Sequence, residues 1–233
     1  METRTSGSEG GPGKRTVQTP HTAPRPDPYT HFKRCPKTAV ITIMDLVTRK
    51  WICEVVSAEE TGTQVQVAFC DALELEGLLD LVDARVAGLA DRSVDDGVVP
   101  ILLAVSDNGP QMTSGSTREF MAMCAIAQHF GRPGTPTDQA WIESLFSHIK
   151  ADWPHLDQVT DPAVLRAELA VVRVEYNTVR LHAGIGYVTP DDEHEGRGPA
   201  IRRARRVGLM RARRQRIAYH RLQRHQRQPP ETR

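Results

Sequence analysis

The chain has 233 residues, of which 39% are hydrophobic, enough for one domain with extensions or for two small domains. No stretch approaches the roughly 20 apolar residues of a membrane span, and the first residues lack the apolar region of a secretory signal, so we expect no membrane partner and a cytoplasmic location. The net charge of +1 hides an asymmetry, since residues 196–233 carry 13 Arg and one acid, or +12, which leaves −11 for residues 1–195. This distribution favours a polyanion partner, most simply DNA; a solvated tail that folds back on the acidic body is the alternative.

Three regions are expected along the chain. Residues 1–28 are rich in Gly, Pro, Ser and Thr and show no periodicity, which predicts disorder. An ordered domain is expected over residues 29–195, followed by a basic extension over residues 196–233. Four cysteines are present without a C-x-x-C spacing, which is typical of reduced core residues. They are Cys35, Cys53, Cys70 and Cys124.

The first half of the domain predicts strands around a helical region. Residues 38–45 (TAVITIMD) and 50–57 (KWICEVVS) are β-branched and apolar, and their closeness predicts an antiparallel hairpin. A helix is expected over residues 63–90, with a break near Gly77 because glycine is poor in helix interiors. The continuous apolar run at residues 99–105 predicts a short strand covered on both faces.

The second half predicts helices. An S-x-x-E capping box at Ser116 and Glu119 starts a helix that we expect to run to Gly131. After the Pro/Gly loop RPGTPTD, residues 138–151 predict a second helix, and Asp161 with the proline after it predicts the start of a third. The apolar stripe of the second helix recurs at helical spacing. Its members are Ile142, Leu145, Phe146 and Ile149. Together these elements predict an α/β fold, a mixed sheet flanked by helices.

Two carboxylates are candidates for chemistry. Asp107 follows the apolar strand in SDNG, where a tight Asn-Gly turn would leave it facing a crevice at the end of a sheet; the alternative is a turn-capping aspartate. Glu143 and Lys150 are seven residues apart and so share one helix face, with Ser147 between them, about 100° from the apolar stripe. The alternative for this second group is an ordinary solvated charge pair.

The two carboxylates also carry a family resemblance. SDNG, followed after a loop and helix by PTDQAWIESLFSHIK, resembles the catalytic core of retroviral integrases and of bacterial insertion-sequence transposases of the DDE class. The segments YNTVRLHAGIGYVTP (residues 176–190) and MDLVTRKW (residues 44–51) are similar to further parts of that core. The resemblance covers roughly residues 29–190 and implies a ribonuclease H-like fold.

The resemblance also implies a reaction. It implies DNA transposition or integration through metal-dependent phosphodiester hydrolysis and strand transfer, by a homo-multimer on DNA and without a small-molecule cofactor. Asp107 and Glu143 would hold two Mg²⁺ (or Mn²⁺) ions, which prefer carboxylate oxygens and can stabilise the entering and leaving oxygens of an in-line displacement. Lys150 would contact a DNA phosphate. Of the nine histidines, only His182 in RLHAGIG stands out.

The family's third carboxylate does not align. In these transposases an aspartate ending a strand precedes a segment like THF, but here THF (residues 30–32) follows Pro28, with Asp27 one residue early. Asp27 could serve as the third catalytic carboxylate and metal ligand only if the local chain is displaced, since a shift of one residue turns a strand side chain to the opposite face. Asp45 lies in the hairpin turn, where the family has a recurring acidic turn residue and not a metal ligand, so neither substitute is strongly favoured. One interpretation is a reading frame that begins inside the element, without the family's N-terminal helix-turn-helix region. The second hypothesis is a catalytically defective remnant that only binds DNA.

The basic extension predicts nucleic-acid contacts. Residues 201–228 predict one or two helices with arginine on several faces, packed lightly on the domain or lying along DNA. The candidate DNA-binding arginines are Arg202, Arg203, Arg205, Arg206, Arg211, Arg213 and Arg214.

Overall fold

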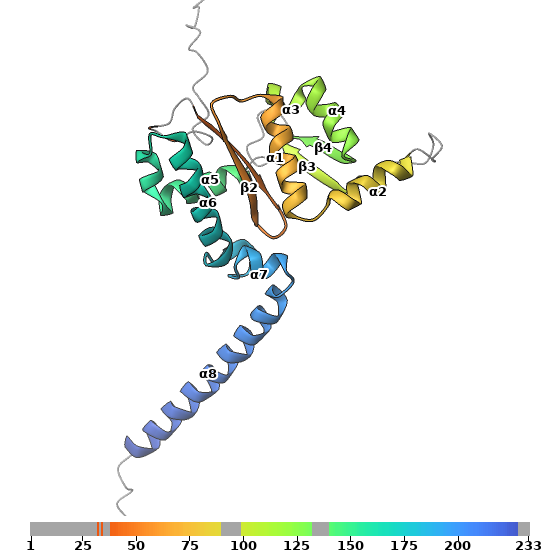
Figure 1. Ribbon diagram of the computed structural model, residues 1–233. Coiled ribbons are helices and arrows are strands. Elements are labelled where there is room, and N and C mark those ends of the chain that lie inside the picture. Colours follow the sequence, from red (N-terminus) through yellow and green to blue (C-terminus); the bar gives the residue numbers. More distant parts are fainter. Residues whose placement is uncertain (1–31, 33, 35–37, 90–98, 132–139, 228–233) are drawn as a thin grey trace, which may run out of the picture.

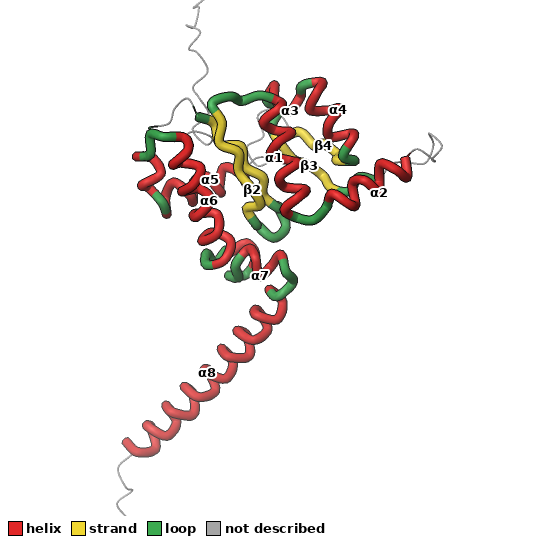
Figure 2. The backbone as a smooth tube through the Cα atoms, viewed as in Figure 1, coloured by secondary structure: helices red, strands yellow, loops and turns green. Residues whose placement is uncertain are grey.

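The computed structural model describes residues 32, 34, 38–89, 99–131 and 140–227 (Figure 1). The expectation of disorder for residues 1–28 lies outside the described residues. The described strands and the helices packed on them form a body from which the last helix extends away (Figures 1 and 2). The predicted α/β class, with both antiparallel and parallel strand pairs and with flanking helices, is confirmed.

The predicted hairpin forms the middle of the body. Strands β1 (Ala39–Met44) and β2 (Trp51–Ser57) pair antiparallel, and the register shifts by one residue after Ile43. Because side chains alternate across a strand, the hairpin has two different faces. One face contacts helix α6 (Pro162–Thr178), and the other contacts helix α1 (Gly62–Leu75).

Each face of the hairpin packs in a different hydrophobic cluster. The α6 cluster joins the hairpin to the C-terminal helices. Its buried members are Phe32, Val40, Trp51, Val56, Leu145, Phe146, Ile149, Leu156, Leu165, Leu169, Val172 and Tyr176. The α1 cluster packs helices on the second strand pair. Its buried members are Val65, Leu73, Val82, Ala104, Met112, Met121 and Ile126.

The expected break in the first helical region is confirmed. Helix α1 ends at Leu75, and helix α2 (Leu79–Leu89) begins after a short turn. Gly77 lies in that turn with φ +64°, in the left-handed region that side chains with a Cβ disfavour. Glycine at this position therefore permits the change of direction between the two helices.

The expected long helix over residues 116–131 is wrong. Helix α4 (Gly115–Met123) is short, and residues 126–130 form strand β4 (Ile126–Phe130) instead. The cap is Ser114, whose hydroxyl accepts from the Thr117 amide, and not Ser116. Strand β4 pairs in parallel with β3 (Leu102–Ser106). The ladder, together with the burial of Ile126, outweighs the helical continuation that the capping pattern favours.

Strand β3 is covered on only one face among the described residues. Ala104 is 7% exposed and belongs to the α1 cluster, whereas Leu103 on the other face is 60% exposed. The expectation of cover on both faces is therefore wrong. The reason is that the described strands form two separate pairs, β1–β2 and β3–β4, and the described helices of the α1 cluster pack on one side of the second pair.

The C-terminal half contains the remaining predicted helices. Helix α5 (Ala140–Asp152) buries the predicted stripe, and Asp161 caps α6 by accepting from the Ala163 amide at 2.8 Å. Short helices η2 (Pro154–Gln158), η3 (Ala183–Ile185) and α7 (Pro190–His194) precede helix α8 (Gly198–Arg227), a single helix of 30 residues. Within the described ranges, no helix combines the length and apolar character that a membrane crossing requires.

The two exposed glycines of the helical region test this account of the turn. Gly77→Ala should lower the free energy of unfolding by about 1 kcal/mol, because alanine disfavours a positive φ. Gly88→Ala, inside α2 and with open space around its Cα, should raise it by roughly 0.5–1 kcal/mol through helix propensity. Urea unfolding measures both changes, and shifts of the same sign would contradict the different roles of the two glycines.

Candidate functional site

Asp107 lies at the carboxyl end of β3, as the sequence predicts. The residue is half-buried, and its Oδ1 accepts a hydrogen bond from the Gly109 amide at 2.9 Å. The Asn108 side chain donates to the Gly131 carbonyl at 2.7 Å and so ties this turn to the end of β4. One carboxylate oxygen therefore caps the turn, and the second has no hydrogen-bond partner among the described residues.

Glu143 lies in the first turn of α5 and Lys150 in its last turn. Both are half-buried, beside a stripe whose members Leu145, Phe146 and Ile149 are buried. The Lys150 ammonium lies 5.5 Å from the centroid of the Phe32 ring, which places its charge over an aromatic face. Glu143 and Lys150 therefore lie on one helix beside the buried stripe, as the sequence predicts.

The elements that carry Asp107 and Glu143 belong to different parts of the hydrophobic core. The strand that leads to Asp107 packs in the α1 cluster, whereas α5 packs in the α6 cluster. Within the part of the chain that the structure describes, no three His, Cys, Asp or Glu side chains are arranged to hold a metal ion. Asp27 lies outside the described residues. A shared metal site of Asp107 and Glu143 stays a prediction.

The Asp45 carboxylate forms contacts within the hairpin turn and with α7. Its Oδ1 accepts from the amides of Val47 at 2.6 Å and Thr48 at 3.1 Å. Its Oδ2 lies 3.6 Å from Nδ1 of His194 on α7, and Nε2 of the same ring lies 2.6 Å from a carboxylate oxygen of Glu76. These contacts hold the turn against α7 and the end of α1, which is the role of a turn residue.

The segment YNTVRLH attaches α6 to the hairpin. The buried Asn177 side chain accepts from the Trp51 amide at 2.9 Å and donates to the Trp51 carbonyl at 2.7 Å. The ring of Tyr176 lies edge-on to Trp51 and to His182, with centroids 6.0 and 4.8 Å apart. Burial raises the pKa of Tyr176, so the phenol stays neutral.

Three basic side chains act electrostatically on His182, and the His148 ring centroid lies 6.5 Å from that of His182. We call the four residues the cationic cluster: Arg49, His148, Arg180 and His182. The electrostatic influence of the other three members and burial together lower the pKa of His182 to about 4, with burial the larger cause. The Arg49 guanidinium lies 3.6 Å from the centroid of the Trp141 ring. Sequence reasoning singled out only His182, because the four residues come from three separate segments and no spacing rule links them.

The arginines of α8 fall into two groups. Arg202 donates to Glu193 and to the Ile185 carbonyl, and Arg205 donates to two carbonyls of the loop that follows η3. These two arginines hold the start of α8 on the body. The other five predicted DNA contacts are exposed, without an ion pair among the described residues. They are Arg203, Arg206, Arg211, Arg213 and Arg214.

Comparison with known proteins supports the resemblance. Residues 124–190, which include Glu143, match the family model of an integrase core domain. The transposase for insertion sequence element IS904 of Lactococcus lactis subsp. lactis (strain IL1403) is 28% identical over 94 residues, 40% of this chain and 37% of that protein. The insertion element IS407 uncharacterized 31.7 kDa protein of Burkholderia multivorans (strain ATCC 17616 / 249) is 26% identical over 144 residues, 59% of this chain and 52% of that protein.

A third relative and two solved structures are similar in part. The insertion element IS476 uncharacterized 39.2 kDa protein of Xanthomonas euvesicatoria is 31% identical over 85 residues, 36% of this chain and 25% of that protein. A crystal structure of the catalytic core domain of BIV integrase overlaps with a TM-score of 0.45 at 20% identity, over 71% of this chain and 93% of that chain. A cryo-EM structure of the simian T-cell lymphotropic virus intasome in complex with PP2A regulatory subunit B56 gamma gives 0.48 at 16% identity, over 70% and 50%.

The predicted resemblance to DDE-class transposases and integrases is confirmed by the family model and by the insertion-element relatives. The chain spans between about a quarter and about half of the length of the three curated relatives it matches.

The environment of His182 predicts a pH dependence of stability. An unfolded histidine takes up a proton near pH 6.5, whereas folded His182 does so only near its pKa of about 4. Acidification between these values therefore favours the unfolded chain, and the loss is complete below about pH 4.

The substitution His182→Asn should remove this part of the pH dependence. The fall in thermal midpoint between about pH 7.5 and about pH 5 should be smaller in the variant than in the wild type. His220→Asn, at an exposed position of α8, is the control and should keep the wild-type fall. Equal falls in all three proteins would contradict a neutral, half-buried His182.

Proposed function

We propose that this chain acts in DNA transposition or integration, as a ribonuclease H-like transposase core that hydrolyses phosphodiester bonds and transfers strands. The observation that carries this proposal is the match of residues 124–190, with Glu143 on its helix, to the integrase core domain. The similarity to the IS904 transposase supports the same class of DNA chemistry. The position of Asp107 at the end of β3 is consistent with a second acidic site residue.

The two carboxylates fit the donor chemistry of a hard divalent cation. Each is half-buried, and neither forms an ion pair with a described residue, so carboxylate oxygens remain for Mg²⁺ or Mn²⁺. Asp107 and Glu143 would hold the ions, which supply charge stabilisation to the oxygens of the reacting phosphate. Lys150 on the same face as Glu143 would orient a DNA phosphate without reading sequence.

A second candidate function is DNA binding without catalysis. The observation that favours it is the state of Asp45, since this substitute for the third carboxylate is used by its own turn and by His194. Two carboxylates alone would hold the metal ions weakly, because each lost ligand lowers affinity. The two candidates differ in strand transfer and agree in DNA binding.

Strand transfer separates the two candidates. With a labelled donor duplex and increasing Mg²⁺, the wild-type chain should join donor to target DNA. Glu143→Gln and Asp107→Asn should each lower the yield by more than about 100-fold, because even indirect partners of metal ligands cost about 10–100-fold.

Matched variants complete this test. Glu119→Gln, at an exposed position of α4, removes one acidic charge away from both carboxylates and should leave the yield unchanged. A wild-type chain without strand transfer at any Mg²⁺ concentration would contradict the catalytic proposal and leave the binding function. Full activity of Glu143→Gln would remove this residue from the site.

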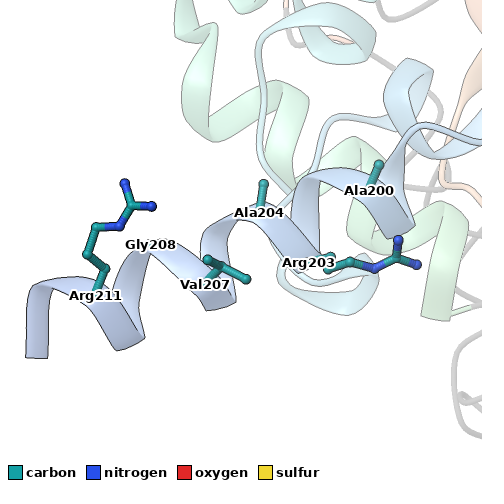
Figure 3. A pocket seen from close by; sticks show the side chains of 6 residues that line it. All are labelled: Ala200, Arg203, Ala204, Val207, Gly208 and Arg211. Carbon is teal, nitrogen blue, oxygen red and sulfur yellow. The ribbon is translucent and has the colours of Figure 1, made fainter. Parts of the chain in front are cut away.

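The exposed arginines of α8 are the second part of the proposal, as contacts to DNA phosphates. Figure 3 shows Ala200, Ala204 and Gly208 along one side of this helix, together with the side chains of Arg203, Val207 and Arg211. Small side chains allow a close approach to the helix, and the arginines supply charge. A homo-multimer on DNA, as expected for joining two ends, is the assembly that we propose for the full reaction.

A triple substitution tests the contacts of α8. Arg211→Gln, Arg213→Gln and Arg214→Gln together should flatten the slope of log affinity against log salt concentration by up to about 3, since each phosphate contact releases about one counterion. Fluorescence anisotropy with a labelled duplex measures the slope. Arg202 and Arg205 stay intact, so the attachment of the helix is preserved; an unchanged slope would exclude these three arginines from the interface.

A further inference from the structure

The cationic cluster lies on a different face of α5 from the predicted metal site. Trp141 and His148 are seven residues apart and so point to nearly the same side of this helix. Glu143 and Lys150 point to the opposite side, about 180° away at 100° per residue. The cluster is therefore separate from the carboxylates that the proposed reaction uses.

Three nitrogens of the cluster are buried without a hydrogen-bond partner in the described structure. They are Nη1 of Arg49, Nε of Arg180 and Nε2 of His182. Leaving a buried donor unpaired is unfavourable, and most such groups in native proteins have a partner in protein, water or ligand. Three unpaired donors in one group of basic residues favour the binding of an anionic acceptor.

The nearby carboxylates do not supply that acceptor. Asp152 forms an ion pair with Nη1 of Arg180, which leaves Nε of the same side chain unpaired. Asp45 directs its oxygens to the hairpin turn and to His194. The two arginines keep the surroundings of His182 positive, and this field opposes protonation of the ring. A neutral ring still has one N–H group to donate.

The position of the cluster beside α8 points to the source of the acceptor. His182 forms a β-bridge with Val188, and this loop receives the Arg205 guanidinium from the start of α8. The exposed arginines of α8 continue from that point along the helix. The loop that carries His182 and the attached end of α8 therefore meet, and DNA bound along α8 would approach the cluster through this loop.

We propose that the cationic cluster is an anion site that binds one phosphate of the DNA backbone through Arg49, Arg180 and His182. A phosphodiester group offers two charged oxygens and suits guanidinium donors, which bind phosphate at fixed geometry. This inference rests on the DNA binding of the proposed function. The Trp141 ring, 47% exposed, stacks on the Arg49 guanidinium beside this site.

DNA binding of the full chain at several salt concentrations tests the site. Arg180→Gln and Arg49→Gln should each weaken binding about 10-fold or more and reduce the salt slope by about 1, as expected for one lost phosphate contact. Arg118→Gln is the matched control, because it removes the same charge at an exposed position of α4. Its affinity and slope should remain those of the wild type.

The outcomes distinguish this inference from the proposed function. A wild type that does not bind DNA would overturn both. A wild type that binds, with Arg180→Gln and Arg49→Gln no different from Arg118→Gln, would overturn the cluster alone. Inorganic phosphate identifies the source of the anion: if it raises the thermal midpoint of the wild type while the DNA slopes of the variants stay unchanged, the site takes free phosphate and the DNA assignment is wrong.

A measurement on the wild type does not depend on the folding of any variant. The imidazole resonances of His182, followed by NMR during titration with a short duplex, should show its pKa rising when a phosphate accepts from Nε2. The resonances are assigned by comparison with His182→Asn. An imidazole whose pKa is the same with and without bound duplex would overturn the proposal even if Arg49→Gln or Arg180→Gln fails to fold.

Discussion

The attachment of α6 to the hairpin depends on one side chain, which bonds to the backbone of a strand as a neighbouring strand would. Asn177 on α6 pairs with both the amide and the carbonyl of Trp51. Ile43 pairs with Cys53 but Met44 pairs with Trp51, so the register of the hairpin shifts and the ladder is irregular at Trp51. A buried amide that satisfies both backbone groups fixes the position of α6 on the hairpin. Tyr176, Arg180 and His182 belong to the same segment, YNTVRLH, and this contact therefore positions them as well.

The second determinant is the alternation of side chains across the hairpin. Because Val56 faces α6 and Cys53 faces α1, one pair of strands separates two clusters. This division explains why the strand before Asp107 and the helix that carries Glu143 pack in different hydrophobic clusters. It also explains why the cationic cluster, which is built on the α6 side, lies next to the start of α8.

Local patterns in the sequence predicted most elements, and long-range pairing decided the rest. The hairpin, the break at Gly77 and the stripe on α5 follow from periodicity and residue preference, which act over a few residues. Strand β4 could not be predicted in this way, because Ile126 becomes a strand residue only when Leu102 lies beside it. The same limit applies to the cationic cluster, whose members meet only after folding, and to the distinction between bound and exposed arginines on α8.

The attachment of α8 has a consequence for the reach of the molecule. Thirty residues at 1.5 Å each give a rod of about 45 Å, close to the length of 13 base pairs of duplex DNA at about 3.4 Å per pair. Arg202 and Arg205 fasten one end of this rod. This helix is thus longer than one turn of the double helix, and the position of its fastened end sets how far from the body its exposed arginines lie.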